Sequence, residues 1–240
     1  MAEDFGNQST TSRKVYPSVA DALAGLTDGA VVVIGGYAGR GVPETLVRAL
    51  MVAGVKNLTC VCQGSWPRQA EFPDRPDRVD VADLVEAGLV TKLIAPLPFH
   101  PDHGGPVRDL WESGELEIEA VPTGILAERL RAGGAGIGGI FLPTGAGTRF
   151  ANGNEVREID GRDHLFQPAL KADFALLRAH EADILGNLVY RGTQRNWNPI
   201  MAMCAAITVA EVDQVHELGG IDPELVITPA IFVDRIVQTR

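Results

Sequence analysis

Residues Gly35–Gly41 form the part of this sequence best suited to bind an anion. They read Gly-Gly-Tyr-Ala-Gly-Arg-Gly, so four of the seven positions are glycine. Glycine lets the backbone come close to a ligand, and backbone N–H groups then donate to an anion or to a developing oxyanion. The site that we predict here consists of Gly35, Gly36, Tyr37, Ala38, Gly39, Arg40 and Gly41.

The segments on either side of these glycines would hold them in place. Val31–Ile34 is a run of four branched apolar residues, which is typical of a buried strand. A helical pattern begins at Pro43, which suits a first helical turn, and continues to Val52. A helix N-terminus carries unpaired N–H groups and a positive dipole end. The strand, the glycine loop and the helix together therefore predict an anion site.

Polar side chains gather again before another predicted helix. Arg191 and Arg195 are able to hold a carboxylate or a phosphate. Asn196 or Asn198 is suited to cap the helix that follows, with Pro199 at its first position. The sequence leaves both interpretations of this cluster open, ligand binding and helix capping.

Two smaller groupings indicate metal or thiol chemistry more weakly. His100 and His103 are spaced for a metal or a protonatable pair, but the prolines and glycines around them are as typical of a solvated loop. Cys60 and Cys62 share one face of a predicted strand, with no further metal ligand nearby in sequence. We predict no metal site, and we expect the cysteines to be buried, reduced thiols.

A second glycine-rich stretch, Gly134–Gly139, matches the dinucleotide fingerprint G-x-G-x-x-G letter for letter. That fingerprint needs a strand before it and a helix after it. Here a predicted helix precedes the stretch and an extended apolar segment follows it. We therefore interpret it as a tight helix-to-strand connection rather than a nicotinamide site.

The composition excludes several classes of partner. The chain has 240 residues, with 21 basic and 31 acidic side chains and a formal net charge of −10. That charge disfavours nucleic acid and anionic membranes, which bind a basic face. The polar N-terminus lacks the apolar core of a secretory signal, and the sequence has no apolar run of roughly eighteen residues. We expect a cytoplasmic protein.

Helical and strand patterns alternate along the chain, which predicts an open, mostly parallel α/β sheet flanked by helices. We expect a flexible N-terminus at residues 1–14 and a single domain over residues 15–240. The predicted helices are Val19–Leu26, Pro43–Val52, Val81–Ala87, Ile125–Arg131 and Asn198–Ala206. The predicted strands are Val31–Ile34, Leu58–Val61, Val90–Ile94, Leu116–Val121, Ile140–Leu142, Phe174–Ala179 and Ile207–Glu211, and the chain closes with Leu225–Thr228 and Ile231–Val237. The predicted irregular segments are Trp66–Asp80 and Pro96–Pro106.

From about Val15 onward, a series of motifs resembles the alpha (A) subunit of class I CoA-transferases, of the 3-oxoacid and 3-oxoadipate type. The motifs are Gly35–Glu44, Gly114–Glu119, Ile125–Ile137, Leu142–Thr148, Ala172–Leu177, Leu185–Leu188, Arg195–Met201 and Ile227–Ile236. The resemblance implies a CoA-transferase-like fold and a chain that works only with a beta subunit, in an α2β2 or larger complex. It also implies coenzyme A as a substrate, with no permanently bound cofactor.

The same resemblance implies how the reaction proceeds. The nucleophile is a glutamate of the beta subunit, which attacks the acyl-CoA, and CoA then moves to a carboxylic (3-oxo) acid through a glutamyl-CoA intermediate. This chain therefore has no catalytic nucleophile of its own. Its glycine loop, Gly35–Gly41, would bind CoA or the oxyanion, and its other residues would shape the acyl pocket.

The chain departs from the family pattern in three places. Gln63-Gly-Ser-Trp66 stands where the family usually has Asn-Asn-Ala-Gly, and Pro122-Thr-Gly124 stands where it has Pro-Gln-Gly. Between them, Pro67–Pro106 looks longer and richer in proline than usual. Because the replaced amides face substrate in the family, the resemblance implies a changed specificity, toward a less polar acyl group. The predicted pocket residues are Gln63, Gly64, Ser65, Trp66 and Thr123.

Two other functions are compatible with these motifs. The alpha chain of a CoA-thioester ring-opening hydrolase of the same fold also lacks the Asn-Asn pair, and the presence of a nucleophilic glutamate in the partner chain would discriminate the two. A ligand-sensing domain on this fold would need a DNA-binding extension, and no basic helix-turn-helix is visible in the sequence.

Overall fold

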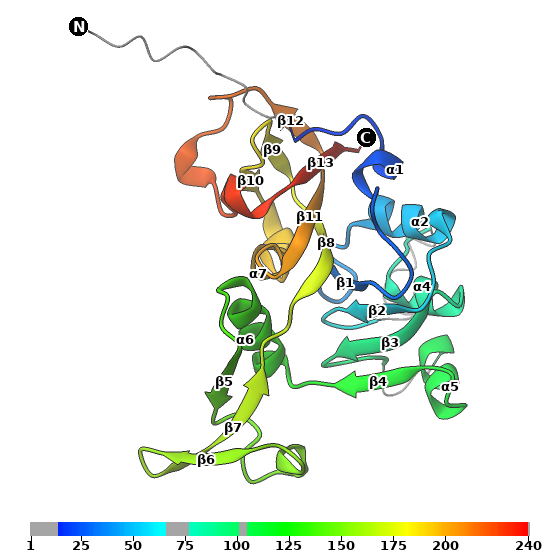
Figure 1. Ribbon diagram of the computed structural model, residues 1–240. Coiled ribbons are helices and arrows are strands. Elements are labelled where there is room, and N and C mark those ends of the chain that lie inside the picture. Colours follow the sequence, from blue (N-terminus) through cyan, green and yellow to red (C-terminus); the bar gives the residue numbers. More distant parts are fainter. Residues whose placement is uncertain (1–13, 66–76, 101–104, 240) are drawn as a thin grey trace, which may run out of the picture.

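The centre of the molecule is a seven-stranded sheet of order β13-β11-β8-β1-β2-β3-β4, in which every neighbouring pair is parallel (Figure 1). The computed structural model describes residues 14–65, 77–100 and 105–239. The strands are β1 (Val31–Ile34), β2 (Leu58–Val61), β3 (Val90–Ala95), β4 (Glu117–Ala120), β8 (Ala172–Arg178), β11 (Ala205–Val212) and β13 (Arg235–Gln238). The predicted open, parallel α/β sheet is confirmed. The expected flexible N-terminus falls, up to residue 13, outside the described residues.

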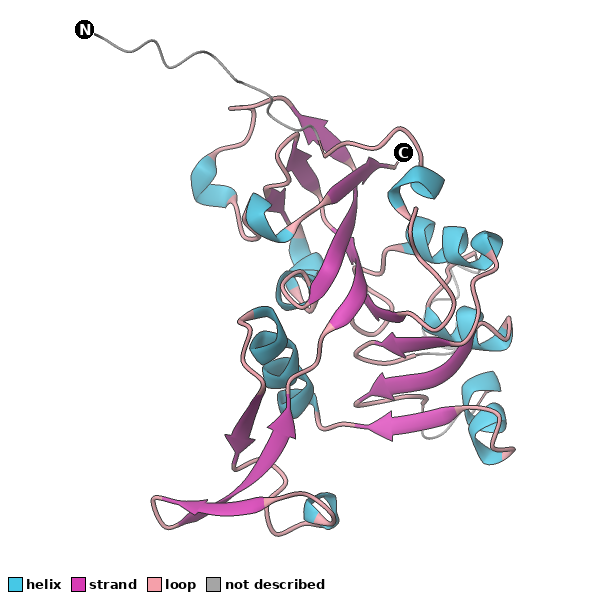
Figure 2. Cartoon of the chain, in the orientation of Figure 1, coloured by secondary structure: helices cyan, strands magenta, loops and turns pink. Residues whose placement is uncertain are grey.

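Helices cover both faces of this sheet (Figures 1 and 2). On one face lie α1 (Val19–Ala22), α2 (Glu44–Ala53), α4 (Val81–Glu86) and α5 (Pro106–Glu112), and on the other lie α6 (Thr123–Gly134) and α7 (Asn198–Met201). Successive residues of β1 enter the two buried clusters alternately, because side chains of a strand alternate between its faces. Val32 and Ile34 belong to one cluster and Val33 to the other. Since both faces are covered, β1 is apolar along its whole length.

The order of the strands reverses beside β1. The chain adds β2, β3 and β4 on one side of β1 and then adds β8, β11 and β13 on the other. Because the strands are parallel, their carboxyl ends lie at one edge of the sheet. In open α/β sheets ligands bind in the crevice outside the carboxyl ends of the strands, at the point where the order reverses. That point here lies between β1 and β8.

Two small sheets extend the structure. An antiparallel sheet of β5 (Gly139–Leu142), β7 (Arg162–Pro168) and β6 (Val156–Ile159) projects beyond α6, at the bottom of Figure 1. A second small sheet contains β9 (Glu181–Asp183), β10 (Leu188–Val189) and β12 (Gln214–His216) and lies at the other end of the molecule. The sequence patterns missed both β6 and β7, because β6 is mostly exposed and lacks a buried apolar face.

Several predicted boundaries were wrong. The helix expected over Asn198–Ala206 ends at Met201, and Ala205 instead begins β11 by pairing with Ala172. Alanine suits a helix by propensity, but here the neighbouring parallel strand decides the conformation. The segment Leu225–Thr228 contains the end of a 3-10 turn and one isolated bridge rather than a strand.

Candidate functional site

The glycine loop after β1 is a tight two-residue turn. Tyr37 and Arg40 exchange two backbone hydrogen bonds, each 2.9 Å long. The residues between them, Ala38 and Gly39, have φ angles of 44° and 67°. Positive φ at both central positions is characteristic of a type I′ turn. Ala38 is not glycine, so its left-handed conformation costs about 1–2 kcal/mol, and such strain is typical of functional sites.

The turn presents backbone N–H groups that are not used for folding. Within the described residues, the N–H groups of Ala38, Gly39 and Gly41 meet no hydrogen-bond acceptor. Successive N–H groups of a left-handed turn form a concave site for an anion. The turn therefore offers donors to an anion, and the binding of an oxyanion by Gly35–Gly41 stays a prediction.

The N-terminus of α2, in contrast, is filled by a side chain of this chain. Glu211 Oε2 accepts hydrogen bonds from the N–H groups of Thr45 at 2.9 Å and Leu46 at 3.0 Å. Glu211 comes from β11 and is only 3% exposed. Burial raises the pKa of Glu211 to about 7, although the two N–H groups and Arg178 oppose that rise. The prediction that this helix N-terminus binds a ligand was wrong, because an internal carboxylate takes the place of the anion.

Neither Asn196 nor Asn198 caps α7 with its side chain, and both hold the glycine loop instead. The side chain of Asn196 donates to the carbonyl of Arg40 at 3.0 Å. Asn198 is fully buried, accepts from the N–H of Arg178 at 3.0 Å and donates to the carbonyl of Gly41 at 3.0 Å. These bonds tie the glycine loop after β1 to the start of α7 and, through Asn198, to the end of β8, where the strand order reverses.

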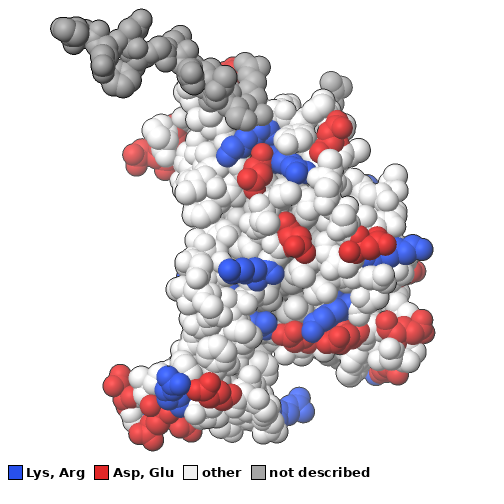
Figure 3. Space-filling view, viewed as in Figure 1, with Lys and Arg blue, Asp and Glu red and all other residues white. Residues whose placement is uncertain are grey.

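A cavity of about 480 Å³ opens beside the glycine loop, between the loop and the end of β8. Four arginines and Glu44 line it, together with the glycines of the turn. The four arginines are Arg40, Arg78, Arg178 and Arg191. Arg195, which the sequence also suggested, is not among the lining residues. This concentration of positive charge stands out in a chain of net charge −10. On the face shown in Figure 3, basic and acidic side chains are otherwise interspersed.

The described residues of the predicted substrate pocket take different places in the structure. Gly64 lines a narrow cleft of about 10 Å³ against the glycine loop. The side chains of Gln63 and Ser65 are buried, and Gln63 Oε1 has no hydrogen-bond partner in the described structure. Thr123 begins α6 and is exposed, whereas Trp66 lies outside the described residues. Their role in binding substrate stays a prediction.

The structure also shows where the cysteines and the second glycine-rich stretch lie. Cys60 and Cys62 are buried, and burial raises the pKa of Cys60 to about 12, so its thiol stays protonated. The described residues contain no group of three histidine, cysteine or acidic side chains arranged to hold a metal, and His103 lies outside them. Gly134–Gly139 joins α6 to β5, which confirms the predicted helix-to-strand connection. None of the described helices is both long and apolar enough to cross a membrane.

Sequence reasoning missed three residues of this site. Arg78 lies in a segment that reads as an exposed loop, yet it is only 6% exposed. Arg178 ends β8, and its position at the carboxyl end of a strand was a usable signal. Glu211 was placed at the end of a predicted strand, but nothing local in the sequence indicates that it reaches α2.

Comparison with known proteins agrees with this geometry. The family described as coenzyme A transferase matches residues 16–239. The A-type chain of the 3-oxoadipate CoA-transferase of Pseudomonas putida is 44% identical over 93% of both chains. The alpha chain of the acetate CoA-transferase of Escherichia coli (strain K12) is 37% identical over 93% of this chain and 96% of its own length.

A solved structure shows the same fold. An acyl-CoA transferase of E. coli O157:H7, solved as a thioester complex with CoA, superposes with a TM-score of 0.80 at 20% identity. The match covers 95% of this chain and 48% of the solved chain, so this chain spans about half of that protein. The names of the relatives favour CoA transfer over the ring-opening hydrolase alternative. The chain therefore belongs to the coenzyme A transferase family, as a CoA-transferase subunit of the alpha type.

Proposed function

We propose that this chain works with a beta subunit to move CoA between an acyl-CoA and a carboxylic acid in the cytoplasm. The observation that carries the proposal is the glycine turn at the reversal of strand order, with the N–H groups of Ala38, Gly39 and Gly41 free of acceptors in the described structure. Its relatives are named as subunits A or alpha, which supports a partner chain, and we propose an α2β2 or larger complex.

In this proposal the beta subunit supplies the nucleophilic glutamate and this chain supplies the oxyanion site. Attack of the glutamate on the thioester carbonyl places negative charge on its oxygen, to which the N–H groups of the turn donate. Expulsion of the CoA thiolate leaves an acyl-glutamyl anhydride, and return of the thiolate to the glutamyl carbonyl releases the acid and forms glutamyl-CoA. The turn needs no rearrangement, because Asn196 and Asn198 already hold it.

In this proposal the acyl group is selected by Gln63, Gly64, Ser65, Trp66 and Thr123. These residues stand where the family usually has Asn-Asn-Ala-Gly and Pro-Gln-Gly, and the differences favour a less polar acyl chain. Gly64 is the member of this set that lies in the cleft against the glycine loop. Replacing Gln63→Asn, Gly64→Asn and Thr123→Gln together is expected to move activity toward short 3-oxoacids such as acetoacetate. An unchanged substrate profile in the folded triple variant would place these residues outside the pocket.

The test of the proposed function is to purify the chain alone and in complex with its beta subunit. CoA transfer by the complex from an acyl-CoA to an added acid is expected, and the chain alone, free of partner by mass spectrometry, is expected to be inactive. Release of free CoA without any acceptor acid would instead support hydrolysis. Robust transfer by the isolated chain would contradict the division of roles between the subunits.

A further inference from the structure

Four large apolar side chains are exposed within a short segment near the carboxyl end of the chain. They are Leu218, Leu225, Ile227 and Ile231, and Ile231 is 80% exposed. Only eleven large apolar side chains are exposed in all the described residues, so these four are concentrated. Residues 218–231 are here called the apolar segment. Exposed apolar side chains that gather in one place are characteristic of a surface that a partner covers.

The backbone that carries the most exposed of these side chains is held in place. The N–H of Ala230 donates to Asn187 Oδ1 at 2.9 Å. Lys14 Nζ donates to the carbonyl of Ala230 at 2.8 Å and to the carbonyl of Val233 at 2.6 Å. These bonds fix the turn that contains Ile231. An apolar side chain presented by a fixed backbone loses little conformational freedom when a partner binds.

The apolar segment lies beyond the carboxyl edge of the central sheet, where the glycine turn also lies. β9 begins three residues after the end of β8, and β12 begins two residues after the end of β11. The small sheet of β9, β10 and β12 therefore continues from the carboxyl ends of those strands. The apolar segment lies at this end of the molecule, at the upper left of Figure 1, in orange to red.

Hydrogen bonds connect the apolar segment to the loop that lines the cavity beside the glycine turn. The N–H of Ile227 donates to the carbonyl of Leu188 at 3.0 Å, and the N–H of Leu188 donates to the carbonyl of Thr228 at 2.9 Å. Arg191, three residues after Leu188, lines the cavity. Three residues span at most about 11 Å. A protein interface that includes the cavity and covers about 800 Å² per partner therefore extends to the apolar segment.

The charges in and beside the apolar segment are all acidic. Glu217, Asp222 and Glu224 are exposed, and residues 217–231 contain no lysine, arginine or histidine. Figure 3 shows an acidic group at the outer edge of this part of the surface. Interfaces have an apolar centre and a polar rim, and the charges across them are complementary. The apolar segment therefore fits a partner that presents apolar side chains surrounded by basic ones.

The proposed function requires a partner at this edge of the sheet. The beta subunit has to bring its glutamate to the glycine turn, so it covers the cavity and the surface around it. We propose that the apolar segment binds the beta subunit, which contacts it with apolar side chains and a basic rim. The inference rests on the proposed function and names the surface that holds the partner. A second copy of this chain in a two-fold contact would bring the same acidic residues together, so it fits less well.

The experiment compares Ile231→Lys, Ile231→Ser and Val52→Lys in the complex with the beta subunit. Val52 is 87% exposed on α2, so it serves as the matched control. Sedimentation velocity over a dilution series measures the Kd for dissociation of the beta subunit. Ile231→Lys is expected to raise this Kd about 10- to 100-fold, because its charge would be buried against a basic rim, and Ile231→Ser about 10-fold. Val52→Lys is expected to leave the Kd unchanged.

Two further measurements separate binding of the partner from other roles. At concentrations above its raised Kd, Ile231→Lys is expected to regain the wild-type kcat, because the side chain holds the partner and takes no part in the reaction. Asp222→Asn combined with Glu224→Gln is expected to reduce the rise of the Kd with salt, because it removes acidic charges that pair with the rim. An unchanged salt dependence in this double variant would contradict the basic rim.

Wild-type Kd values for Ile231→Lys, or an equal rise in Val52→Lys, would overturn the inference. Separation of copies of this chain from one another, with the beta subunit still bound, would also overturn it, because a second copy would then cover the segment. If Ile231→Lys does not assemble at any concentration, the Kd of Ile231→Ser decides in the same way. A wild-type complex that assembles but transfers no CoA would count against the proposed function and leave the dilution test of the segment valid.

Discussion

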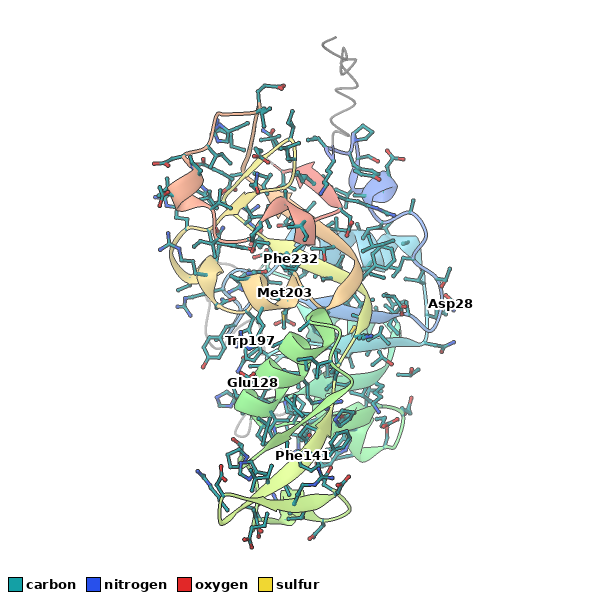
Figure 4. The ribbon with its side chains drawn as sticks, turned by 60° about the vertical axis from the view of Figure 1, so that its left-hand side comes forward. Asp28, Glu128, Phe141, Trp197, Met203 and Phe232 are labelled. Carbon is teal, nitrogen blue, oxygen red and sulfur yellow. The ribbon has the colours of Figure 1, made fainter. Side chains whose placement is uncertain are left out.

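Two glycine-rich segments of this chain have similar composition and opposite uses of glycine. Gly35–Gly41 lies at the carboxyl edge of the parallel sheet, where its tight turn has positive φ angles and Gly39 and Gly41 line an open cavity. Gly134–Gly139 lies between α6 and β5, where a Cβ on Gly134 would be 2.5 Å from the Cβ of Met203. Figure 4 shows Met203 beside the end of α6. Glycine allows a tight turn whose N–H groups lack an acceptor among the described residues in the first segment, and it admits a neighbouring backbone in the second.

A glycine-rich sequence therefore indicates a ligand site only when its position relative to the sheet is also known. The second segment carries the dinucleotide fingerprint, yet it leads into the antiparallel sheet of β5, β7 and β6. No parallel strand delivers it to the carboxyl edge, so it cannot present N–H groups at the crevice where ligands bind. The first segment lacks the fingerprint and occupies that crevice.

The largest effect is expected from a methyl group in the first segment. Gly39→Ala would strain the turn at a φ of 67° and push the added carbon against Arg78. We expect turnover of the assembled enzyme to fall about 100- to 1,000-fold, the effect of losing an oxyanion donor. Gly138→Ala is the matched control in the second segment, because a Cβ there meets nothing within 4 Å. Near-normal turnover of an assembled Gly39→Ala enzyme would show that the turn is only structural.

The second-largest expected effect is a dependence of the unfolding free energy on pH. It arises next to the first segment, at Glu211, which accepts hydrogen bonds from the start of α2. Burial raises the pKa of Glu211 from 4.5 to about 7, so the folded chain keeps a proton that the unfolded chain has lost in this range. The unfolding free energy should therefore fall by up to about 3 kcal/mol as the pH rises from about 4.5 to 7, and then level off.

Glu211→Gln removes this slope, because glutamine does not titrate while its amide oxygen still accepts from Thr45 and Leu46. Urea denaturation at pH 5, 6, 7 and 8 compares the two proteins. Glu128→Gln, at a partly exposed ion pair on α6, controls for the loss of a charge. Parallel profiles of wild type and Glu211→Gln would contradict the buried titration.

The second segment should respond in stability rather than in activity. Gly134→Ala places a methyl group against the backbone carbonyl of Met203, 2.7 Å from its oxygen, where little relaxation is available. We expect a loss of about 1–3 kcal/mol of unfolding free energy, measured by urea denaturation, with kcat unchanged. A fall in kcat at full stability would mean that this connection also belongs to the site.

The fold was predictable where local patterns decide the structure. The branched run Val31–Ile34 is buried on both faces, so its composition alone marks it as a central strand. The hairpin of β6 and β7 was not predictable, because Val156–Ile159 is mostly exposed and shows no apolar alternation. The start of β11 at Ala205 depends on pairing with Ala172, and the sequence near Ala205 gives no indication of this pairing.

The same distinction between local patterns and long-range contacts applies to the functional site. The glycine turn is a local feature, and its composition was enough to single it out. The carboxylate that fills the N-terminus of α2 is not local, because Glu211 reaches Thr45 across 166 residues. Arg78 was hidden in a polar, proline-rich segment, and a tertiary contact places its guanidinium against Gly39. Residues that reach the site through tertiary contacts leave little signal in a single sequence.

The smallest expected effect concerns the strain in the first segment. Ala38 has a φ of 44°, and relieving a left-handed alanine gains about 1–2 kcal/mol, while glycine makes the unfolded chain more flexible by about 0.4–1 kcal/mol. Ala38→Gly is therefore expected to raise the unfolding free energy by up to about 1.6 kcal/mol, with turnover unchanged because the N–H groups keep their places. Ala49→Gly, within the helix α2, is the control and should lose about 1 kcal/mol. If both variants lost the same stability in urea denaturation, the turn would hold no strain, and the left-handed conformation of Ala38 would need another explanation than the oxyanion site.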